Sequence, residues 1–264
     1  MARREEIIRQ VRKALGRPSD MPCEISENGL PPASPLAGIL PVIAPEEMLP
    51  KFEAELTKVA GIPHRAANRQ ELEGILQSIL SHANATSVVL SRNPLLAELS
   101  LEPKLRAWGQ GVSVWPVLGG KESPGNEDTS LRTFAEAGFS ANVGITGVEF
   151  ALAETGSLVV TSWTEGSQLA SLAPPVHVAL YRRNQLVASL DEVLQRLGNE
   201  EVGTKRLAPA DSPTGSQTSP TLPGRSVVFI TGTSRTADIE QILIRGVHGP
   251  GELHAILVEE NCFS

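Results

Sequence analysis

Residues 70–90 read QELEGILQSILSHANATSVVL, and the spacing of the hydrophobic residues changes halfway along this stretch. The first part, 70–82, has the spacing of an amphipathic helix, carried by Leu72, Ile75, Leu76, Ile79 and Leu80. The last part, 86–90, is a short β-branched run that predicts a buried strand. A helix that leads directly into an apolar strand is the building unit of α/β proteins.

The same alternation continues on both sides of this stretch. Helical spacing predicts further helices over residues 46–59, 95–108, 130–137, 190–197 and 236–245. Short apolar runs predict strands over residues 112–118, 157–161, 176–180, 226–231 and 255–258. Strands that alternate with helices favour a mostly parallel sheet flanked by helices, so the predicted fold class is α/β.

The first 45 residues differ from the rest of the chain and are predicted to form a separate arm. Residues 1–17 hold six basic and two acidic residues, with Ile7, Val11 and Leu15 on one stripe of a predicted helix. Because the stripe is narrow and lacks Trp and Phe, it favours docking on the acidic remainder of the chain or on a partner over membrane binding. Residues 18–45 contain seven prolines, which predict an extended segment.

The remaining residues, 46–264, are predicted to form one α/β domain. The stretch 199–225 is rich in Gly, Pro, Ser and Thr, which predicts a mobile surface insertion within that domain. A chain of 264 residues buries enough surface to fold without a disulfide or a metal.

The composition disfavours several classes of protein. The net charge of −7 and the 4% of aromatic residues argue against nucleic-acid binding. No apolar run approaches the length of a membrane span and the first residues do not resemble a signal peptide, so we expect a cytoplasmic protein. The two cysteines, Cys23 and Cys262, are too few for a four-cysteine zinc or iron–sulfur site.

The strongest local signal for a binding site lies between the predicted strand 226–231 and the predicted helix 236–245. Unpaired N–H groups at a helix N-terminus bind anions, and hydroxyl and guanidinium groups add donors there. The candidate ligand-binding residues are Gly232, Thr233, Ser234, Arg235 and Asp238, with Thr231 as a further donor. The structural alternative is that Ser234 or Thr236 simply caps the helix, with Asp238 in its first turn.

A second signal is the segment Glu154-Thr155-Gly156-Ser157 before the predicted strand 157–161. A carboxylate on a tight turn beside a sheet can act as a general acid or base or as a nucleophile, so Glu154 is the candidate catalytic residue. Thr155, Gly156 and Ser157 are candidate ligand-binding residues. The alternative is a glutamate that caps a helix or stabilises the turn.

A third signal is the segment HGPGELH, residues 248–254. His248, Gly249 and His254 are candidate ligand-binding residues. The spacing of the two histidines matches no standard metal site, so we predict no metal and expect histidines that line a pocket or bond to the backbone.

Three segments together resemble the LUD domain family: GITGVEFALAETGSLVV (144–160), TGTSRTADIEQILIRGVHGPGELHAILV (231–258), and the basic helix with its proline-rich arm. The resemblance covers residues 46–264. It implies the α/β architecture shared by ribose-5-phosphate isomerase, glucosamine-6-phosphate deaminase and the CoA transferases. It carries over no catalytic residue, because a shared fold does not transfer a mechanism.

The resemblance also implies a role in the oxidation of L-lactate to pyruvate, as one of three proteins that act together. The other two carry iron–sulfur motifs, and a chain with two cysteines matches the component without a cluster. The resemblance thus implies that the chain alone binds no cofactor and that its partners are iron–sulfur proteins.

The residues themselves leave a second function open. The chain could be a stand-alone enzyme, or a sensor, for a small phosphate, carboxylate or CoA ester. Residues 231–235 would then hold the anionic group, Glu154 would be the acid, base or nucleophile, and His248 and His254 would lie near the pocket. Assembly into a homo-oligomer is compatible with either function.

Overall fold

The computed structural model describes residues 42–116, 127–198, 226–236, 244–246 and 248–263. The chain divides into a unit of residues 1–40 and a unit of residues 41–264, and every described residue belongs to the second unit. The predicted basic helix 1–17, the proline-rich arm up to residue 41 and the predicted insertion 199–225 lie outside the described residues.

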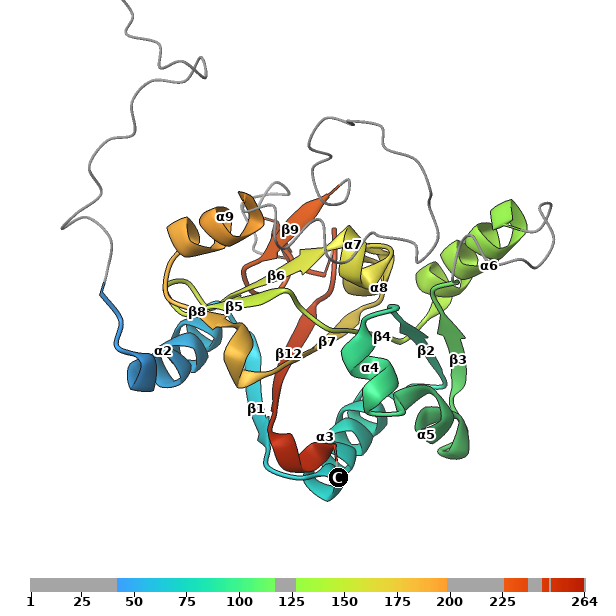
Figure 1. Ribbon diagram of the computed structural model, residues 1–264. Helices are drawn as coiled ribbons and strands as arrows, with labels where there is room; N and C mark the ends of the chain where they lie inside the picture. Colours follow the sequence, from blue (N-terminus) through green and yellow to red (C-terminus); the bar gives the residue numbers. More distant parts are fainter. Residues whose placement is uncertain (1–41, 117–126, 199–225, 237–243, 247, 264) are drawn as a thin grey trace, which may run out of the picture. The chain divides into compact units, whose positions relative to one another are not determined.

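A parallel sheet of six strands is the centre of the structure (Figure 1). Its order is β1 (Ile62–Ala66), β12 (Glu252–Val258), β7 (Val176–Tyr181), β4 (Val143–Thr146), β2 (Ser87–Leu90) and β3 (Gly111–Val114). Every neighbouring pair is parallel. The predicted α/β class, with a mostly parallel sheet flanked by helices, is therefore confirmed.

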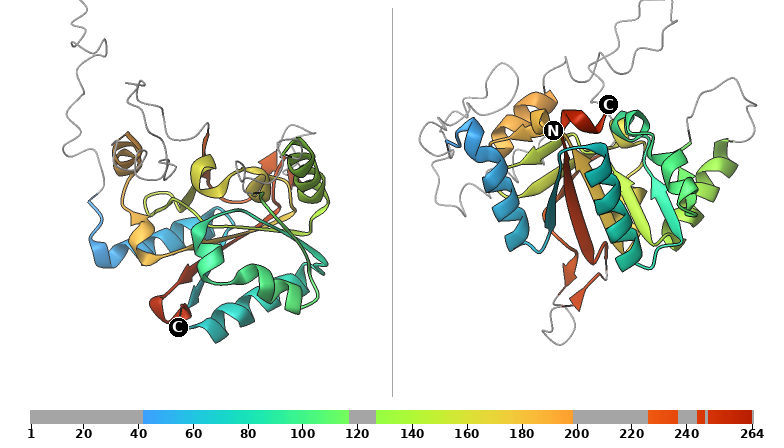
Figure 2. Two further views of the ribbon diagram at one scale, coloured as in Figure 1. Left: turned by 45° about the vertical axis from the view of Figure 1, so that its right-hand side comes forward. Right: turned by 90° about the horizontal axis from the view of Figure 1, so that it is seen from below.

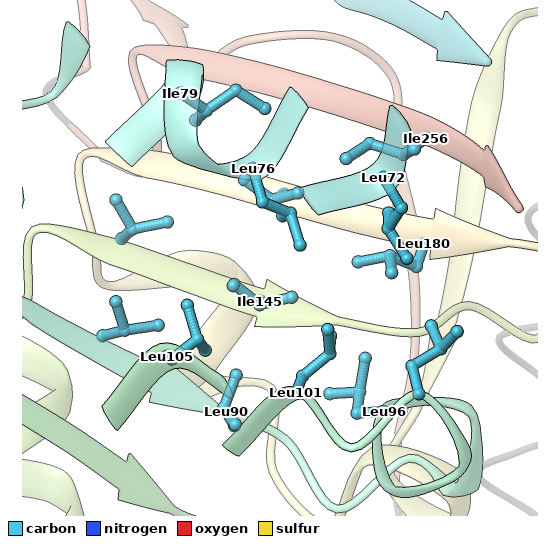
Figure 3. Packing of buried hydrophobic residues seen from close by; sticks show 14 of the residues in the cluster. Leu72, Leu76, Ile79, Leu90, Leu96, Leu101, Leu105, Ile145, Leu180 and Ile256 are labelled. Atoms are coloured by element: carbon cyan, nitrogen blue, oxygen red, sulfur yellow. The ribbon is translucent and has the colours of Figure 1, made fainter. Parts of the chain in front are cut away.

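Three helices cover one face of this sheet: α3 (Arg69–His82), α4 (Pro94–Glu98) and α5 (Leu101–Ala107). Figure 3 shows Leu72 of α3 beside Leu180 and Ile256 of the sheet, and all three belong to one buried cluster. The apolar stripe predicted for this helix packs against the sheet, since Leu72, Leu76, Ile79 and Leu80 are all buried. Burial of such side chains contributes roughly 1.5–3 kcal/mol each.

The predicted helix over residues 95–108 is two helices, because the chain turns between α4 and α5. Ser100 has a φ of +52°, which is the left-handed region and ends a right-handed helix. Pro103 then lies in the first turn of α5, where a missing N–H breaks no helical hydrogen bond.

The other face of the sheet is covered by α2 (Pro45–Lys58), by α6 (Glu127–Ser140), α7 (Ser162–Glu165) and α8 (Leu169–Leu172), and by a second sheet (Figures 1 and 2). This sheet has the order β8 (Leu186–Val187), β5 (Phe150–Leu152), β6 (Ser157–Thr161) and β9 (Val227–Ile230). Phe52 of α2 meets Tyr181 of β7 edge to face, with ring centroids 5.3 Å apart. Leu158 of β6 and Leu257 of β12 belong to the same buried cluster, so the second sheet packs onto the first through an apolar layer.

The predicted helix over residues 236–245 is wrong at both of its ends. β10 (Arg235–Thr236) pairs antiparallel with β11 (Ile244–Arg245), and Thr236 lies opposite Ile244. A helix would separate these two residues by about 12 Å along its axis, whereas partners across an antiparallel pair lie about 5 Å apart. The pairing excludes one helix over this range, and Asp238 lies outside the described residues.

Candidate functional site

The turn Glu154-Thr155-Gly156-Ser157 connects the antiparallel strands β5 and β6. Glu154 Oε2 accepts a hydrogen bond of 3.1 Å from the backbone N–H of Leu190, the first residue of α9 (Leu190–Gly198). A carboxylate at this place satisfies an unpaired N–H and interacts favourably with the helix dipole. The structure thus shows Glu154 in a capping interaction, and its catalytic role stays a prediction.

The glycine-threonine segment that follows β9 lies beside this turn. Strands β6 and β9 pair with Leu158 opposite Ile230, which brings their neighbours together. Ser157 Oγ lies 2.6 Å from Thr231 Oγ1 and 2.7 Å from the hydroxyl of Thr155. Two predicted sites that are 74 residues apart in the sequence therefore share one chain of hydroxyl groups.

Gly156 and Gly232 both allow this double turn to approach helix α2. Their φ angles are +66° and +82°, which side chains other than glycine rarely adopt. A Cβ atom on Gly156 would lie 2.1 Å from the backbone N of Leu56, and one on Gly232 would lie 2.2 Å from the carbonyl O of Val59. Packing against α2 thus requires glycine at both positions.

In the part of the chain that the structure describes, no helix begins directly after residues 232–235, so the helix N-terminus that was expected to bind an anion there is absent. Arg235 starts strand β10 instead, and its side chain is exposed. Thr233 is buried, and its Oγ1 has no hydrogen-bond partner among the described residues. A role for this segment in ligand binding stays a prediction that now depends on its side chains alone.

Ser234 links the same segment to the predicted histidine site. Its Oγ accepts a hydrogen bond of 3.3 Å from the backbone N–H of His248, and its N–H donates to the carbonyl O of Pro250 at 2.9 Å. Gly249 packs beside it, since an added Cβ would lie 3.4 Å from Ser234 Cβ. His248 itself is exposed.

His254 forms a separate group with Glu252 of its own strand, β12, and with His64 of the edge strand β1. Its Nε2 lies 2.7 Å from Glu252 Oε1, and its Nδ1 lies 2.9 Å from Nε2 of His64 on β1. Burial lowers the pKa of His254, and Glu252 opposes that shift. Burial and the neighbouring His254 also lower the pKa of His64.

A pocket at the carboxyl ends of the parallel strands contains none of the residues named from the sequence. Its volume is 270 Å³, and it lies beyond the ends of β2, β4 and β7. The polar residues on its wall include Asn93, Glu149, Thr164, Arg182 and Gln185. We call it the carboxyl-edge pocket.

Glu165 is a buried carboxylate that joins the loops after β2 and β4 next to this pocket. It accepts hydrogen bonds from Ser91 Oγ at 2.5 Å, from Gly147 N at 3.1 Å and from Asn93 Nδ2. A Cβ on Gly147 would lie 2.2 Å from Asn93 Nδ2, so the two loops meet without room for a side chain there. The position of Asn93 on the pocket wall is set by these contacts.

Burial raises the pKa of Glu165, while the hydrogen bonds from Ser91, Asn93 and Gly147 oppose the rise. A buried carboxyl group with opposing influences of this kind is frequent at functional clefts. The same network also fixes the geometry of both loops.

The strand order makes the carboxyl-edge pocket the candidate functional site. From β2 the chain crosses outward to β3, whereas β7 and β12, the later strands of this sheet, lie on the other side of β4 (Figure 1). Open α/β sheets bind ligands in the crevice at such a switch point, at the carboxyl ends of the strands. In the sequence, the only pointer to this pocket is the polar run Ser91-Arg92-Asn93 after the predicted strand 86–90.

The described residues contain no group of three His, Cys, Asp or Glu side chains that could hold a metal ion. Among these residues, too, no helix is long and apolar enough to cross a membrane.

The family model of the LUD domain matches residues 49–258 of this chain. This chain belongs to the LUD domain family. The match includes the turn at Glu154, the carboxyl-edge pocket and the histidine pair of β1 and β12, so each of these features lies within the LUD domain.

Several proteins named lactate utilization protein C are similar to this LUD domain protein. The one from Bacillus mycoides is 27% identical, and the match covers 97% of both chains. The one from Bacillus subtilis is 28% identical over 70% of this chain and 68% of its own. The one from Halalkalibacterium halodurans is 26% identical over 72% of this chain and 70% of its own.

A crystal structure of a DUF162 family protein from Deinococcus radiodurans aligns with 83% of this LUD domain chain and with 100% of its own. The identity is 18% and the TM-score is 0.49. The fold described above comes from this protein's own strand order, and the likeness to ribose-5-phosphate isomerase and the CoA transferases stays a prediction.

Proposed function

We propose that this LUD domain protein acts in the use of L-lactate, as a cluster-free component that works with iron–sulfur proteins in the oxidation of L-lactate to pyruvate. The observation that carries the proposal is the similarity to proteins named lactate utilization protein C, which extends over 97% of both chains in one case. The family match over residues 49–258 supports it.

The cysteines of the chain fit a component without a cluster. Of the two, Cys262 is fully buried and donates a hydrogen bond of 3.3 Å from Sγ to the carbonyl O of Ala66. Burial raises the pKa of this thiol, whereas a cluster ligand must be a thiolate. The clusters are therefore expected on partner proteins. A free buried thiol is also typical of a reducing compartment, and we expect the assembly in the cytoplasm.

Within this role the carboxyl-edge pocket is the expected place for a small anionic ligand such as a carboxylate. Arg182 lies on the pocket wall, ion-paired with Glu98 and with its guanidinium carbon 4.4 Å from the centre of the Phe263 ring. Its Nε is buried and has no hydrogen-bond partner among the described residues. An unpaired buried donor is costly, and the guanidinium group that carries it is the kind of group that forms charge-assisted hydrogen bonds to a carboxylate.

Growth tests the biological role. A strain that lacks the gene is expected to fail on L-lactate as the sole carbon source and to grow normally on glucose. The wild-type gene and an Arg183→Gln variant should both restore growth, because Arg183 is exposed and pairs with Glu259 outside the pocket. Arg182→Gln should restore it poorly. Growth of the deletion strain on L-lactate at the wild-type rate would refute the role.

Affinity purification tests the partnership. A tagged chain recovered from cells grown on L-lactate should bring iron–sulfur proteins with it, measured as bound iron and identified by mass spectrometry. Recovery of the chain alone, under conditions in which another complex of the same cells stays intact, would contradict the partnership while leaving the growth result in place.

The pocket itself favours a second candidate, a stand-alone enzyme or a sensor for a small anion. Thermal shift of the purified chain with L-lactate, pyruvate, phosphate and acetyl-CoA separates the two. A ligand at 100 times its dissociation constant stabilises the native state by about 2.7 kcal/mol. A shift that Arg182→Gln abolishes and Arg183→Gln retains would establish the site in the isolated chain. Turnover by that isolated chain would favour the enzyme.

A further inference from the structure

A second cavity, of 690 Å³, lies at the amino ends of the strands, between α3 and the sheet edge formed by β1 and β12. We call it the α3 cavity. Its wall has an apolar part and a polar part. The apolar part is Ile62, Ile75 and Ile79, and the polar part includes His64, Glu252 and His254. Cavities of this size bind organic molecules larger than lactate.

The three polar residues form a hydrogen-bonded chain in which His64 donates to His254 and His254 donates to Glu252. Glu252 can only accept a hydrogen bond as a carboxylate, so the Nε2 of His254, 2.7 Å away, carries the proton. A neutral His254 then accepts at Nδ1, and the donor is Nε2 of His64 at 2.9 Å. His64 is left with its lone pair on Nδ1. Burial lowers the pKa of both histidines, which favours these neutral forms.

This hydrogen-bonded chain ends in an acceptor that no described residue uses. Among the described residues, His64 Nδ1 has no hydrogen-bond donor, and His64 lines the α3 cavity. A ring whose tautomer is set by two further residues is organised to accept a proton donor from outside the protein.

Gly74 supplies an independent sign that the cavity is kept open. It lies in the middle of α3, where glycine destabilises a helix relative to alanine. It also lines the cavity, and a Cβ atom added to it would meet nothing within 4 Å. No packing contact within the described protein therefore requires glycine at this position, whereas a ligand in the cavity would.

The charges around the cavity favour an uncharged ligand. Arg65 is held by the carboxylate of Glu53 through Nε at 2.6 Å and through a terminal nitrogen at 2.5 Å. Glu71 accepts hydrogen bonds from the N–H of Ala67 and from Asn68. Glu252 bonds to His254, so Arg65, Glu71 and Glu252 each have a partner within the protein. The exposed side chain of His82 also lines the cavity.

We propose that the α3 cavity is a binding site for an uncharged molecule that carries a hydroxyl group on an apolar body, an alcohol or a phenol. The hydroxyl donates to His64 Nδ1, and the apolar body lies against Ile75 and Ile79. This site is separate from the carboxyl-edge pocket and does not depend on the proposed role in lactate use.

The test uses phenol as the probe and anisole as the matched compound without a donor. The full chain is labelled with ¹⁵N-histidine, and the side-chain signals of His64 and His254 are followed by NMR during titration. Phenol is expected to shift both signals to saturation. Anisole should bind about fivefold more weakly or worse, which corresponds to the loss of one net hydrogen bond.

Three variants locate the binding. His64→Phe keeps an aromatic ring but removes the acceptor, and should weaken phenol binding about fivefold. Gly74→Leu fills the cavity and should abolish binding while the protein stays folded by circular dichroism. Gln70→Leu adds a leucine at an exposed position of α3 outside the cavity and should leave the dissociation constant unchanged.

Equal affinity for phenol and anisole would overturn the proposal, as would the absence of a saturable shift of the His64 signal. Unchanged phenol binding in Gly74→Leu would overturn it too. Should His64→Phe fail to fold, the anisole comparison and the leucine variant still decide.

Discussion

Glu165 is fully buried between the loops that follow β2 and β4. Its carboxylate accepts hydrogen bonds from three buried donors, Ser91 Oγ, Asn93 Nδ2 and Gly147 N, and among the described residues none of the three donates to another acceptor. Each donor left without a partner costs about 1–3 kcal/mol, in part recovered by rearrangement. Glu165→Ala is therefore expected to lower the free energy of unfolding by about 3 kcal/mol, measured by urea denaturation at neutral pH.

The matched variant is Glu136→Ala, which removes an exposed glutamate from helix α6. It should change the free energy of unfolding by less than about 0.5 kcal/mol. Equal effects of the two variants would show that the Glu165 network does not hold the loops together.

His177 predicts how stability depends on pH. It is fully buried on β7, with Nε2 2.9 Å from Thr146 Oγ1, and burial lowers its pKa from 6.5 to about 3. Below about pH 6.5 the unfolded chain binds a proton that the folded chain does not bind until about pH 3. Stability is thus complete above about pH 6.5 and falls by up to about 1.4 kcal/mol per pH unit as the pH drops toward 4.

Urea denaturation between pH 7 and pH 4.5 measures this slope, and a His177→Asn variant isolates the contribution of the histidine. The variant is expected to be less stable at pH 7 but to lose stability less steeply as the pH falls. Parallel curves for the two proteins would mean that other groups cause the acid sensitivity.

At the scale of elements, the turn at Gly156 is expected to depend on its contact with α2. In Gly156→Ala the new Cβ would be 2.1 Å from the backbone N of Leu56, in addition to the unfavourable positive φ. We expect a loss of about 3 kcal/mol or more in thermal or urea unfolding.

Gly109→Ala is the control for the backbone effect alone. Gly109 has a φ of +83°, and an added Cβ would meet nothing within 4 Å. This variant should lose only about 1 kcal/mol. If Gly156→Ala were no worse, the close approach of the turn to α2 would be incorrect.

Helix α3 is expected to gain stability from Gly74→Ala. The position is in the helix interior and has open space for a methyl group, so the substitution removes the cost of glycine without a clash. Without any ligand we expect about 0.5–1 kcal/mol of added stability, seen as a higher melting temperature. A lower melting temperature would show that the space around Gly74 is already filled.

Elements were predictable where their pattern is local. The helices over 46–59 and 70–82 agree with α2 and α3 to within about one residue, because one apolar stripe per helix decides them. Strand β1 gave no such signal, since Pro63 interrupts it and only an edge strand tolerates proline. The hydrophobic residues over 236–245 have helical spacing, yet the two ends of this range pair as the antiparallel strands β10 and β11.

The candidate site was less predictable than the elements, for a geometric reason. The turn at 154–157 and the segment 231–234 could be named from composition, and the structure brings them together through Ser157 and Thr231. The carboxyl-edge pocket instead combines loops after three strands, with Asn93, Val148 and Arg182 among its lining residues. Their proximity follows from the strand order, which the sequence pattern does not specify.

At the scale of the whole molecule, Cys262 reports on the opening of the structure. It is fully buried in the turn η2 (Glu260–Cys262), and its thiol bonds to Ala66 at the end of β1. In a Cys23→Ser variant it is the one remaining thiol. Its reaction with a thiol reagent in the native protein should be at least about 100-fold slower than in urea, because the chain must first open. Similar rates in both conditions would contradict this burial.

The strand order also makes completion of the parallel sheet depend on the synthesis of β12. β1 pairs with β12 alone among the described strands, and 190 residues separate His64 from His254 across that pair. A ribosome adds about 5–20 residues per second, so β1 emerges roughly 10–40 s before its partner exists. In the last part of that interval, after β7 (Val176–Tyr181) has also been made, β1 and β7 both present bare hydrogen-bonding edges, which attract other chains. A chain that stops before β12 would keep these edges exposed, and we expect molecular chaperones to bind it or proteases to degrade it.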